Sequence, residues 1–126
     1  MIYNDFENYI NHRNNTSTTR KEDLTHRFYT LMMDNYREHK EVIFYADKLH
    51  VSSKYLSEVV KETSGKSPKD WIIDYSLLEI KELLKNSSLN IQEITIRTKF
   101  LNQSALGRFF KRHTNMSPSE YRESTY

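Results

Sequence analysis

Cysteine is absent from this chain of 126 residues. Its absence excludes disulfide bonds, thiolate metal sites and a cysteine nucleophile, and it is compatible with a reducing compartment. Glycine and proline, which form turns and end helices, occur only twice each. Their scarcity, together with apolar residues spaced by three and four, predicts an all-α protein.

Other features are missing as well. No apolar run approaches the roughly 20 residues that a membrane span requires, and the N-terminus is polar, so we expect a cytoplasmic protein. The five histidines are scattered without metal-binding spacing, and no glycine-rich phosphate loop occurs. The sequence therefore predicts no enzyme activity, no cofactor and no metal site.

A repeated pattern runs through the second half of the chain. Shifting residues 56–71 by fifty positions aligns Leu56 with Leu106, Val60 with Phe110, Lys61 with Lys111, Ser67 and Pro68 with Ser117 and Pro118, and Trp71 with Tyr121. Just before each copy the offset is forty-nine, so the second copy has one extra residue, Leu101, in its turn. A short helix, a tight turn and a second helix, used twice, predict two helix-turn-helix motifs.

The predicted organisation has four parts and about seven helices. Residues 1–22 are expected to form a short amphipathic helix and a polar linker, the remnant of a preceding region. Residues 23–66 form the first helix-turn-helix subdomain, residues 67–86 a connecting helix and residues 87–126 the second subdomain. At about 1.5 Å per residue the connecting helix spans on the order of 25 Å. That length could hold two recognition helices about one DNA turn apart.

Helix signals place the individual elements. A helix with one apolar face is expected over residues 22–40, followed by a short positioning helix over residues 41–49. Five side chains suit the N-cap of the helix that follows them: Ser52, Ser67, Asn90, Asn102 and Ser117. The helices after Ser52 and Asn102, which run to about residues 63 and 113, are the candidate recognition helices. Gly65 is the expected stop of the first one.

The net charge of +2 is modest, but it is unevenly distributed. Residues 95–116 contain no acidic side chain and five basic ones, which are Arg97, Lys99, Arg108, Lys111 and Arg112. Residues 46–94 hold seven Lys against eight Asp or Glu. The second motif is therefore electropositive and the first has no general basic field. Charge alone fits a solvated helix face as well as contact with DNA.

Three stretches of the second motif resemble a known family. Residues 94–100, 104–112 and 117–122, with Phe-Phe-Lys-Arg-His-Thr and Ser-Pro-x-x-Tyr-Arg as the most telling pieces, look like the C-terminal signature of the AraC/XylS transcription regulators. The resemblance covers about residues 23–123. The chain departs from the family pattern at three positions: Lys99 and Asn115 replace Gly, and Leu106 replaces an aromatic residue. Asparagine tolerates the left-handed conformation, whereas a turn built for glycine is expected to be strained or reshaped at Lys99.

The resemblance implies a sequence-specific binder of double-stranded DNA that inserts both recognition helices into adjacent major grooves from one chain. Most members also carry an N-terminal effector or dimerisation domain. We therefore expect either a DNA-binding domain cut from a longer regulator, which the polar linker and first helix favour, or a short stand-alone member. In the first case a preceding N-terminal domain could supply dimerisation. RNA polymerase is a further expected partner.

The first candidate recognition helix should turn Leu56, Val59 and Val60 towards the core. Four of its side chains are then candidates for base contacts: Ser53, Lys54, Ser57 and Glu58. Lys54 suits guanine or a phosphate, and Glu58 suits the amino group of cytosine. The family more often has a basic residue where Glu58 stands. Pairing of Glu58 with Lys54, one turn earlier on the same helix, is the alternative that we favour.

The second candidate recognition helix should bury Leu106, Phe109 and Phe110. Its candidates for base contacts are Gln103, Ser104, Gly107 and Arg108. Gln103 suits adenine and Arg108 suits guanine. Gly107 either allows close approach to the groove floor or is simply tolerated in the helix.

Phosphate contacts position a helix on DNA without reading sequence. The candidates are Ser52, Lys61, Asn102, Lys111 and Arg112. The alternative function is a helical protein-interaction module that contacts the transcription machinery without base-specific readout. Added salt should separate the two, because it weakens binding to DNA steeply and a mostly apolar protein interface little.

Overall fold

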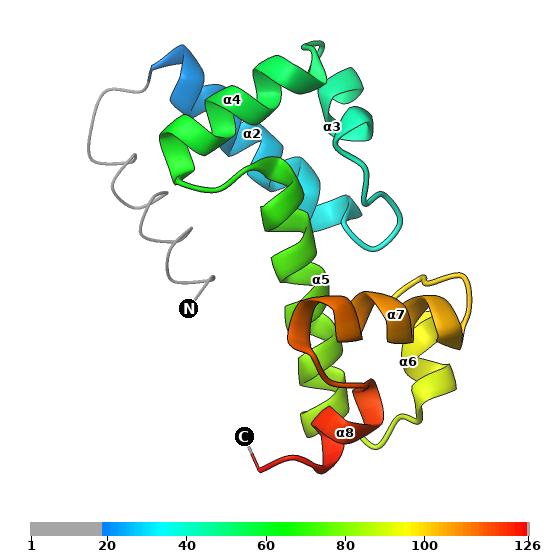
Figure 1. Ribbon diagram of the computed structural model, residues 1–126. Coiled ribbons are helices and arrows are strands. Elements are labelled where there is room, and N and C mark those ends of the chain that lie inside the picture. The colour runs from blue at the N-terminus through cyan, green and yellow to red at the C-terminus, as the bar shows by residue number, and fades with distance from the viewer. Residues whose placement is uncertain (1–18, 126) are drawn as a thin grey trace. The chain divides into compact units, whose positions relative to one another are not determined.

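The structure, a computed structural model, describes residues 19–125. Of the helix and linker expected over residues 1–22, residues 1–18 lie outside the described part, and residues 20–22 belong to a helix. The described part of the chain is helical without a strand, as predicted (Figure 1). The helices are α2 (Arg20–Asn35), α3 (Val42–Lys48), α4 (Ser53–Ser64), α5 (Pro68–Asn86), α6 (Ile91–Arg97), α7 (Gln103–Thr114) and α8 (Pro118–Glu123). The chain divides into two compact units within α5. The first unit ends at Tyr75 and the second begins at Ser76. The four-part division drawn from the sequence stays a prediction.

Helix α2 begins with a capping box. The Thr19 hydroxyl accepts a hydrogen bond from the Glu22 N–H, and the Glu22 carboxylate accepts one from the Thr19 N–H, each at 3.0 Å. Helix α2 runs from Arg20 to Asn35. The predicted bounds of this helix, residues 22 and 40, are both wrong.

Local and tertiary contacts end α2 well before residue 40. The Asn35 side chain donates to the carbonyl of Leu31 at 2.8 Å, and the Asn35 carbonyl, one of the acceptors left free at the helix end, accepts from the backbone N–H of His39 at 2.9 Å. Farther along, the His39 carbonyl accepts a hydrogen bond from the Tyr45 hydroxyl at 2.7 Å, and the His39 ring stacks on Phe44 with 3.7 Å between centroids. Burial raises the pKa of Tyr45, which keeps the phenol protonated as a donor to higher pH than an exposed tyrosine.

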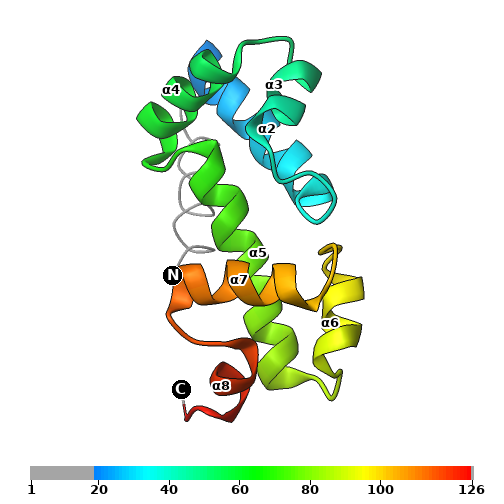
Figure 2. The same ribbon diagram turned by 45° about the vertical axis from the view of Figure 1, so that its right-hand side comes forward.

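Unit 1 is held together by the apolar faces of its helices. Helices α2, α3 and α4 pack against one another (Figures 1 and 2). Fully buried side chains of this core include Phe28, Met32, Tyr45, Leu56, Val60 and Trp71. The Trp71 indole N–H donates to the Ser64 hydroxyl at 2.9 Å, so its one polar atom is satisfied inside the core.

Unit 2 combines the C-terminal part of α5 with α6, α7 and α8 (Figure 2). Its buried apolar side chains include Ile80, Leu84, Ile94, Leu106 and Phe110. Tyr121 of α8 lies edge-on to Phe110, with 5.4 Å between ring centroids. Arg122 donates to the carbonyls of Leu83 and Leu84 at 3.2 and 2.8 Å, which places a cation at the negative end of α5.

The five predicted N-caps are confirmed. Each side chain accepts a hydrogen bond from the backbone N–H three residues later, at 2.8–3.2 Å, in Ser52, Ser67, Asn90, Asn102 and Ser117. Gly65 and Asn115 end α4 and α7 in the left-handed conformation, with φ of 87° and 63°. Asn115 thus takes the role that the family gives to glycine.

Each helix-turn-helix turn contains one left-handed residue, and in neither turn is it glycine. His50 and Lys99, which the forty-nine-residue offset makes equivalent, have φ of 59° and 64°. The next residue of each turn donates back to the preceding helix, Val51 to Ala46 at 3.0 Å and Phe100 to Thr95 at 3.1 Å. The turns are closed in the same way despite the missing glycine. Left-handed geometry costs a residue with a Cβ about 1–2 kcal/mol.

Glycine at either turn should therefore stabilise its unit. We expect His50→Gly and Lys99→Gly each to raise the free energy of unfolding by about 0.5–1 kcal/mol, since part of the gain offsets the greater freedom of unfolded glycine. Urea denaturation monitored by circular dichroism measures the change. Lys48→Gly in right-handed helix α3 is the matched control and should lose about 1 kcal/mol. Loss of stability in both turn variants would contradict left-handed strain.

Candidate nucleic-acid interface

Helix α4 presents a polar face opposite its buried one. Leu56, Val59 and Val60 are buried, as predicted. Three exposed side chains lie on the opposite side of the helix at spacings of four and three residues: Lys54, Glu58 and Lys61. These residues form the centre of the surface that α4 offers to a partner.

Helix α7 repeats this division. Leu106 and Phe110 are buried, whereas Phe109 is half-buried between the rings of Phe100 and His113, at 5.1 and 4.9 Å between centroids. The residues at the centre of the exposed face are Ser104, Arg108 and Lys111, which occupy the positions of Lys54, Glu58 and Lys61 in α4.

Most of the predicted contact residues are accessible. Ten are exposed: Ser52, Lys54, Glu58, Lys61, Asn102, Gln103, Ser104, Arg108, Lys111 and Arg112. Three are half-buried: Ser53, Ser57 and Gly107. In the two caps, Ser52 and Asn102, the side-chain oxygens already accept a hydrogen bond from their own helix. A phosphate at either cap would therefore meet the remaining backbone N–H groups of the helix rather than these side-chain oxygens.

Gln103 has a partner that sequence reasoning missed. Its amide nitrogen donates to the side-chain oxygen of Gln92 on α6 at 2.7 Å. One N–H and the carbonyl oxygen of Gln103 remain, and these are the two groups that a bidentate contact with adenine requires. Gln92 thus holds the amide of Gln103 by a hydrogen bond, and its place eleven residues away on another helix gave no local signal.

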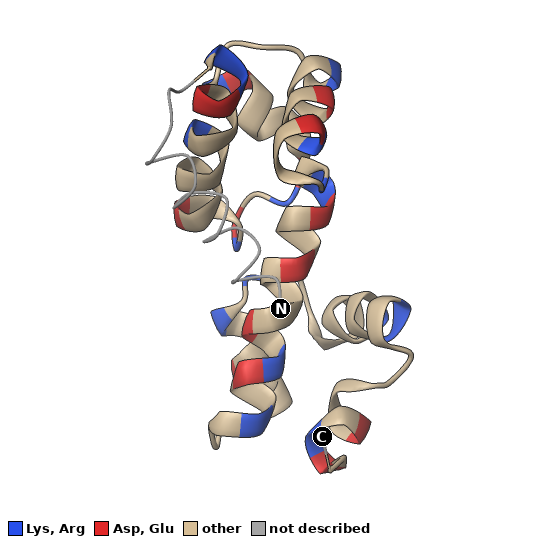
Figure 3. Ribbon diagram, turned by 90° about the vertical axis from the view of Figure 1, so that its left-hand side faces the viewer, with Lys and Arg blue, Asp and Glu red and all other residues tan. Residues whose placement is uncertain are grey.

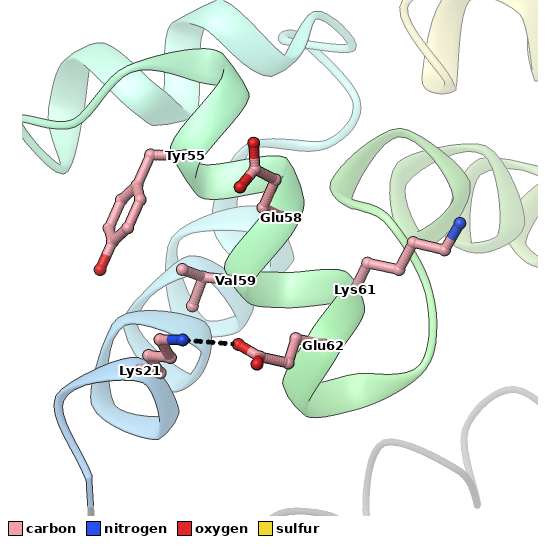
Figure 4. Close-up of a pocket in the computed structure, with 6 residues that line it drawn as sticks. All are labelled: Lys21, Tyr55, Glu58, Val59, Lys61 and Glu62. Atoms are coloured by element: carbon pink, nitrogen blue, oxygen red, sulfur yellow. Dashed lines mark hydrogen bonds and ion pairs between the residues drawn. The ribbon is translucent and has the colours of Figure 1, made fainter.

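The predicted pairing of Glu58 with Lys54 is wrong: no ion pair joins them in the part of the chain that the structure describes. The acidic residue of α4 that is paired is Glu62, whose carboxylate lies 2.9 Å from Lys21 Nζ on α2 (Figure 4). The hydrogen bond and charge of Glu62 raise the pKa of Lys21. Lys21 falls in the segment assigned to the linker, so its part in this surface was missed.

Glu58 belongs to a hollow beside this ion pair. The hollow is lined by Lys21, Tyr55, Glu58, Val59, Lys61 and Glu62, and Figure 4 shows Glu58 one turn along α4 from the bonded Glu62. Its lining is mostly charged, unlike the apolar pockets that bind small molecules. We therefore treat it as part of the surface of α4.

The two candidate recognition helices differ in charge. In α4, Lys54 and Lys61 are balanced by Glu58 and Glu62, whereas α7 carries Arg108, Lys111 and Arg112 and no acidic residue (Figure 3). The electropositive second motif expected from the sequence is therefore present on an exposed helix face. Within residues 19–125, no helix combines the length and apolar content that crossing a bilayer demands.

The chain thus contains two helix-turn-helix motifs, each with a capped second helix and an exposed polar face. This architecture places it among the proteins with paired helix-turn-helix motifs. A family model described as a helix-turn-helix domain matches residues 45–124. The HTH-type transcriptional regulator YobQ of Bacillus subtilis, itself uncharacterised, is 32% identical over 77 residues, covering 61% of this chain and 32% of its own. The chain belongs to the AraC/XylS family of transcription regulators and comprises its DNA-binding domain.

Solved structures share the fold. The C-terminal domain of AraT, a response regulator from Geobacillus stearothermophilus, is 25% identical with a TM-score of 0.72, covering 86% of this chain and 93% of that one. The DNA-binding domain of the transcription factor AdpA, solved in complex with a target DNA, has a TM-score of 0.67 at 23% identity, covering 78% and 88%. The chain spans about a third of the length of the curated relatives that it matches. The matched family is one of transcription regulators, in agreement with the prediction that the chain is not an enzyme.

The protein itself does not require glycine at position 107. A Cβ there would meet no atom within 4 Å, and glycine weakens a helix by about 1 kcal/mol relative to alanine. We expect Gly107→Ala to raise the free energy of unfolding by about 1 kcal/mol in urea denaturation. Ser57→Gly at the equivalent position of α4 is the matched control and should lower it. A destabilised Gly107→Ala variant would show a packing role for Gly107.

Proposed function

We propose that this chain binds double-stranded DNA sequence-specifically by inserting α4 and α7 into adjacent major grooves. The observation that carries the proposal is the presence of two capped helices, each with its apolar face buried and a polar face exposed. A major groove admits one helix, and sequence is read there by side chains on the exposed face. The AdpA domain of the same fold, solved with its target DNA, supports this use of the fold.

Helix α7 is proposed to supply one half of the readout. Arg108 is exposed and suits the two acceptors of guanine. Gln103, held by Gln92, suits adenine, and Ser104 adds a short donor and acceptor. Lys111 and Arg112 are proposed to bind phosphates. Because no protein atom crowds Gly107, we propose that close approach of DNA explains this glycine, and the Gly107→Ala variant should then bind DNA more weakly although it is more stable.

Helix α4 is proposed to supply the other half. Ser53, Lys54, Ser57 and Glu58 face the bases, and Lys61 contacts a phosphate. The N-termini of both helices, at Ser52 and Asn102, are placed to bind phosphates through backbone N–H groups. RNA polymerase and dimerisation through a preceding domain stay proposals from the family resemblance. The balanced charge of α4 favours the alternative of a protein-interaction module more than any other observation does.

Selection from a random double-stranded DNA library near physiological salt tests the proposal. The expected result is a bipartite site with half-sites about 10 base pairs apart, because one turn separates successive major grooves on one face. A variant with both Gln103→Ala and Arg108→Ala should relax one half only. Absence of any enriched sequence, with a correctly folded chain, would contradict DNA reading and support the protein-interaction alternative.

The phosphate contacts predict a different response from the base contacts. Lys111→Ala and Arg112→Ala should weaken binding about equally on the selected site and on unrelated DNA. Each should also reduce the slope of log affinity against log salt by about 0.9, the value for one lost phosphate contact. Fluorescence anisotropy over a salt series measures both effects. Unchanged slopes would show that Lys111 and Arg112 do not contact DNA phosphates.

A further inference from the structure

Glu58 stands out on the surface of α4 because no cation among residues 19–125 forms an ion pair with its carboxylate. It is exposed at the centre of the polar face, between Lys54 and Lys61, and no hydrogen bond or ion pair joins it to either residue. Glu62, one turn later, is held by Lys21 at 2.9 Å (Figure 4). The two acidic residues of α4 therefore differ in kind. One is neutralised within the fold, and the other is presented to whatever binds the helix.

A free carboxylate in a DNA groove costs affinity unless it meets a donor, because phosphates surround it. The base edges of the major groove offer two donors, the N4 amino group of cytosine and the N6 amino group of adenine. Adenine also presents the N7 acceptor beside its amino group, which repels the second carboxylate oxygen. Cytosine has no such neighbouring acceptor. The guanine paired with cytosine presents O6 and N7, which suit the flanking Lys54 or Lys61.

The equivalent position of α7 has the opposite character. Arg108 occupies it, and Arg112 stands where α4 has Glu62. An arginine there suits guanine and also attracts phosphates, so it adds affinity as well as discrimination. Glu58 repels phosphates and can only discriminate. The two recognition helices are thus suited to different tasks.

We propose that Glu58 reads a cytosine in the half-site of α4, and that α4 thereby adds specificity while α7 supplies most of the electrostatic affinity. This inference rests on the proposed function, since it requires that α4 enter a major groove. In this proposal Glu58 contacts a C·G base pair, and its carboxylate accepts a hydrogen bond from the amino group of the cytosine.

The experiment compares the wild-type chain with Glu58→Gln, Glu58→Ala and Glu62→Gln. The α4 half-site is the half that keeps its preference in the variant with Gln103→Ala and Arg108→Ala. In the wild type, replacing the cytosine of that half should weaken binding by about 5- to 150-fold, the range for one good base contact. Glu58→Ala should reduce that factor to near one and bind unrelated DNA more tightly. Glu58→Gln should shift the preference towards adenine.

Glu62→Gln is the matched control. It removes the same charge one turn away and releases Lys21, so it should also tighten binding to unrelated DNA, but it should keep the cytosine preference. Circular dichroism establishes that each variant is folded. Cytosine preference that survives Glu58→Ala overturns the inference, as does an enriched bipartite site without cytosine in the α4 half. These results leave the proposed function standing, whereas a wild type that enriches no site contradicts both.

Discussion

Burial of one face of α4 and one face of α7 determines which side chains a partner can reach. Leu56, Val59 and Val60 fix the rotation of α4 about its axis, and Leu106 with Phe110 fixes that of α7. A helix whose apolar stripe is held in a packed core cannot turn without exposing it. Residues at the opposite positions are therefore presented with little freedom, which is what base readout requires. A polar substitution in either stripe would disturb folding and recognition together.

The two motifs share a backbone design and differ in surface chemistry. Caps, turns and the left-handed residues at His50 and Lys99 recur at matching positions. The exposed faces have diverged, because a side chain there touches no core and can change without loss of packing. Glu58 and Arg108 are the clearest pair, with opposite charges at equivalent positions. Under the proposed function, the two helices of one chain would recognise unlike half-sites, which suits a non-palindromic DNA sequence.

Local patterns in the sequence predicted the features that depend on neighbouring residues. Capping and the apolar spacing act within one or two turns, so the five N-caps and the buried faces of α4 and α7 were predictable. Contacts between distant segments were not. Lys21 and Glu62 are 41 residues apart, and His39, in the segment after α2, contacts Tyr45 and Phe44 of the next helix. The i, i+4 spacing of Lys54 and Glu58 permits a pair, but such exposed pairs contribute little energy and need not form.

Hydroxyl-radical footprinting of the purified chain on its selected duplex tests the central claim most directly. If α4 and α7 both enter major grooves of one duplex, two protected regions should appear on one face, about 10 base pairs apart. Both should be lost together at high salt, since a single chain makes the contacts. One protected region, unchanged by substitutions in α4, would contradict the account and show that α7 alone engages DNA.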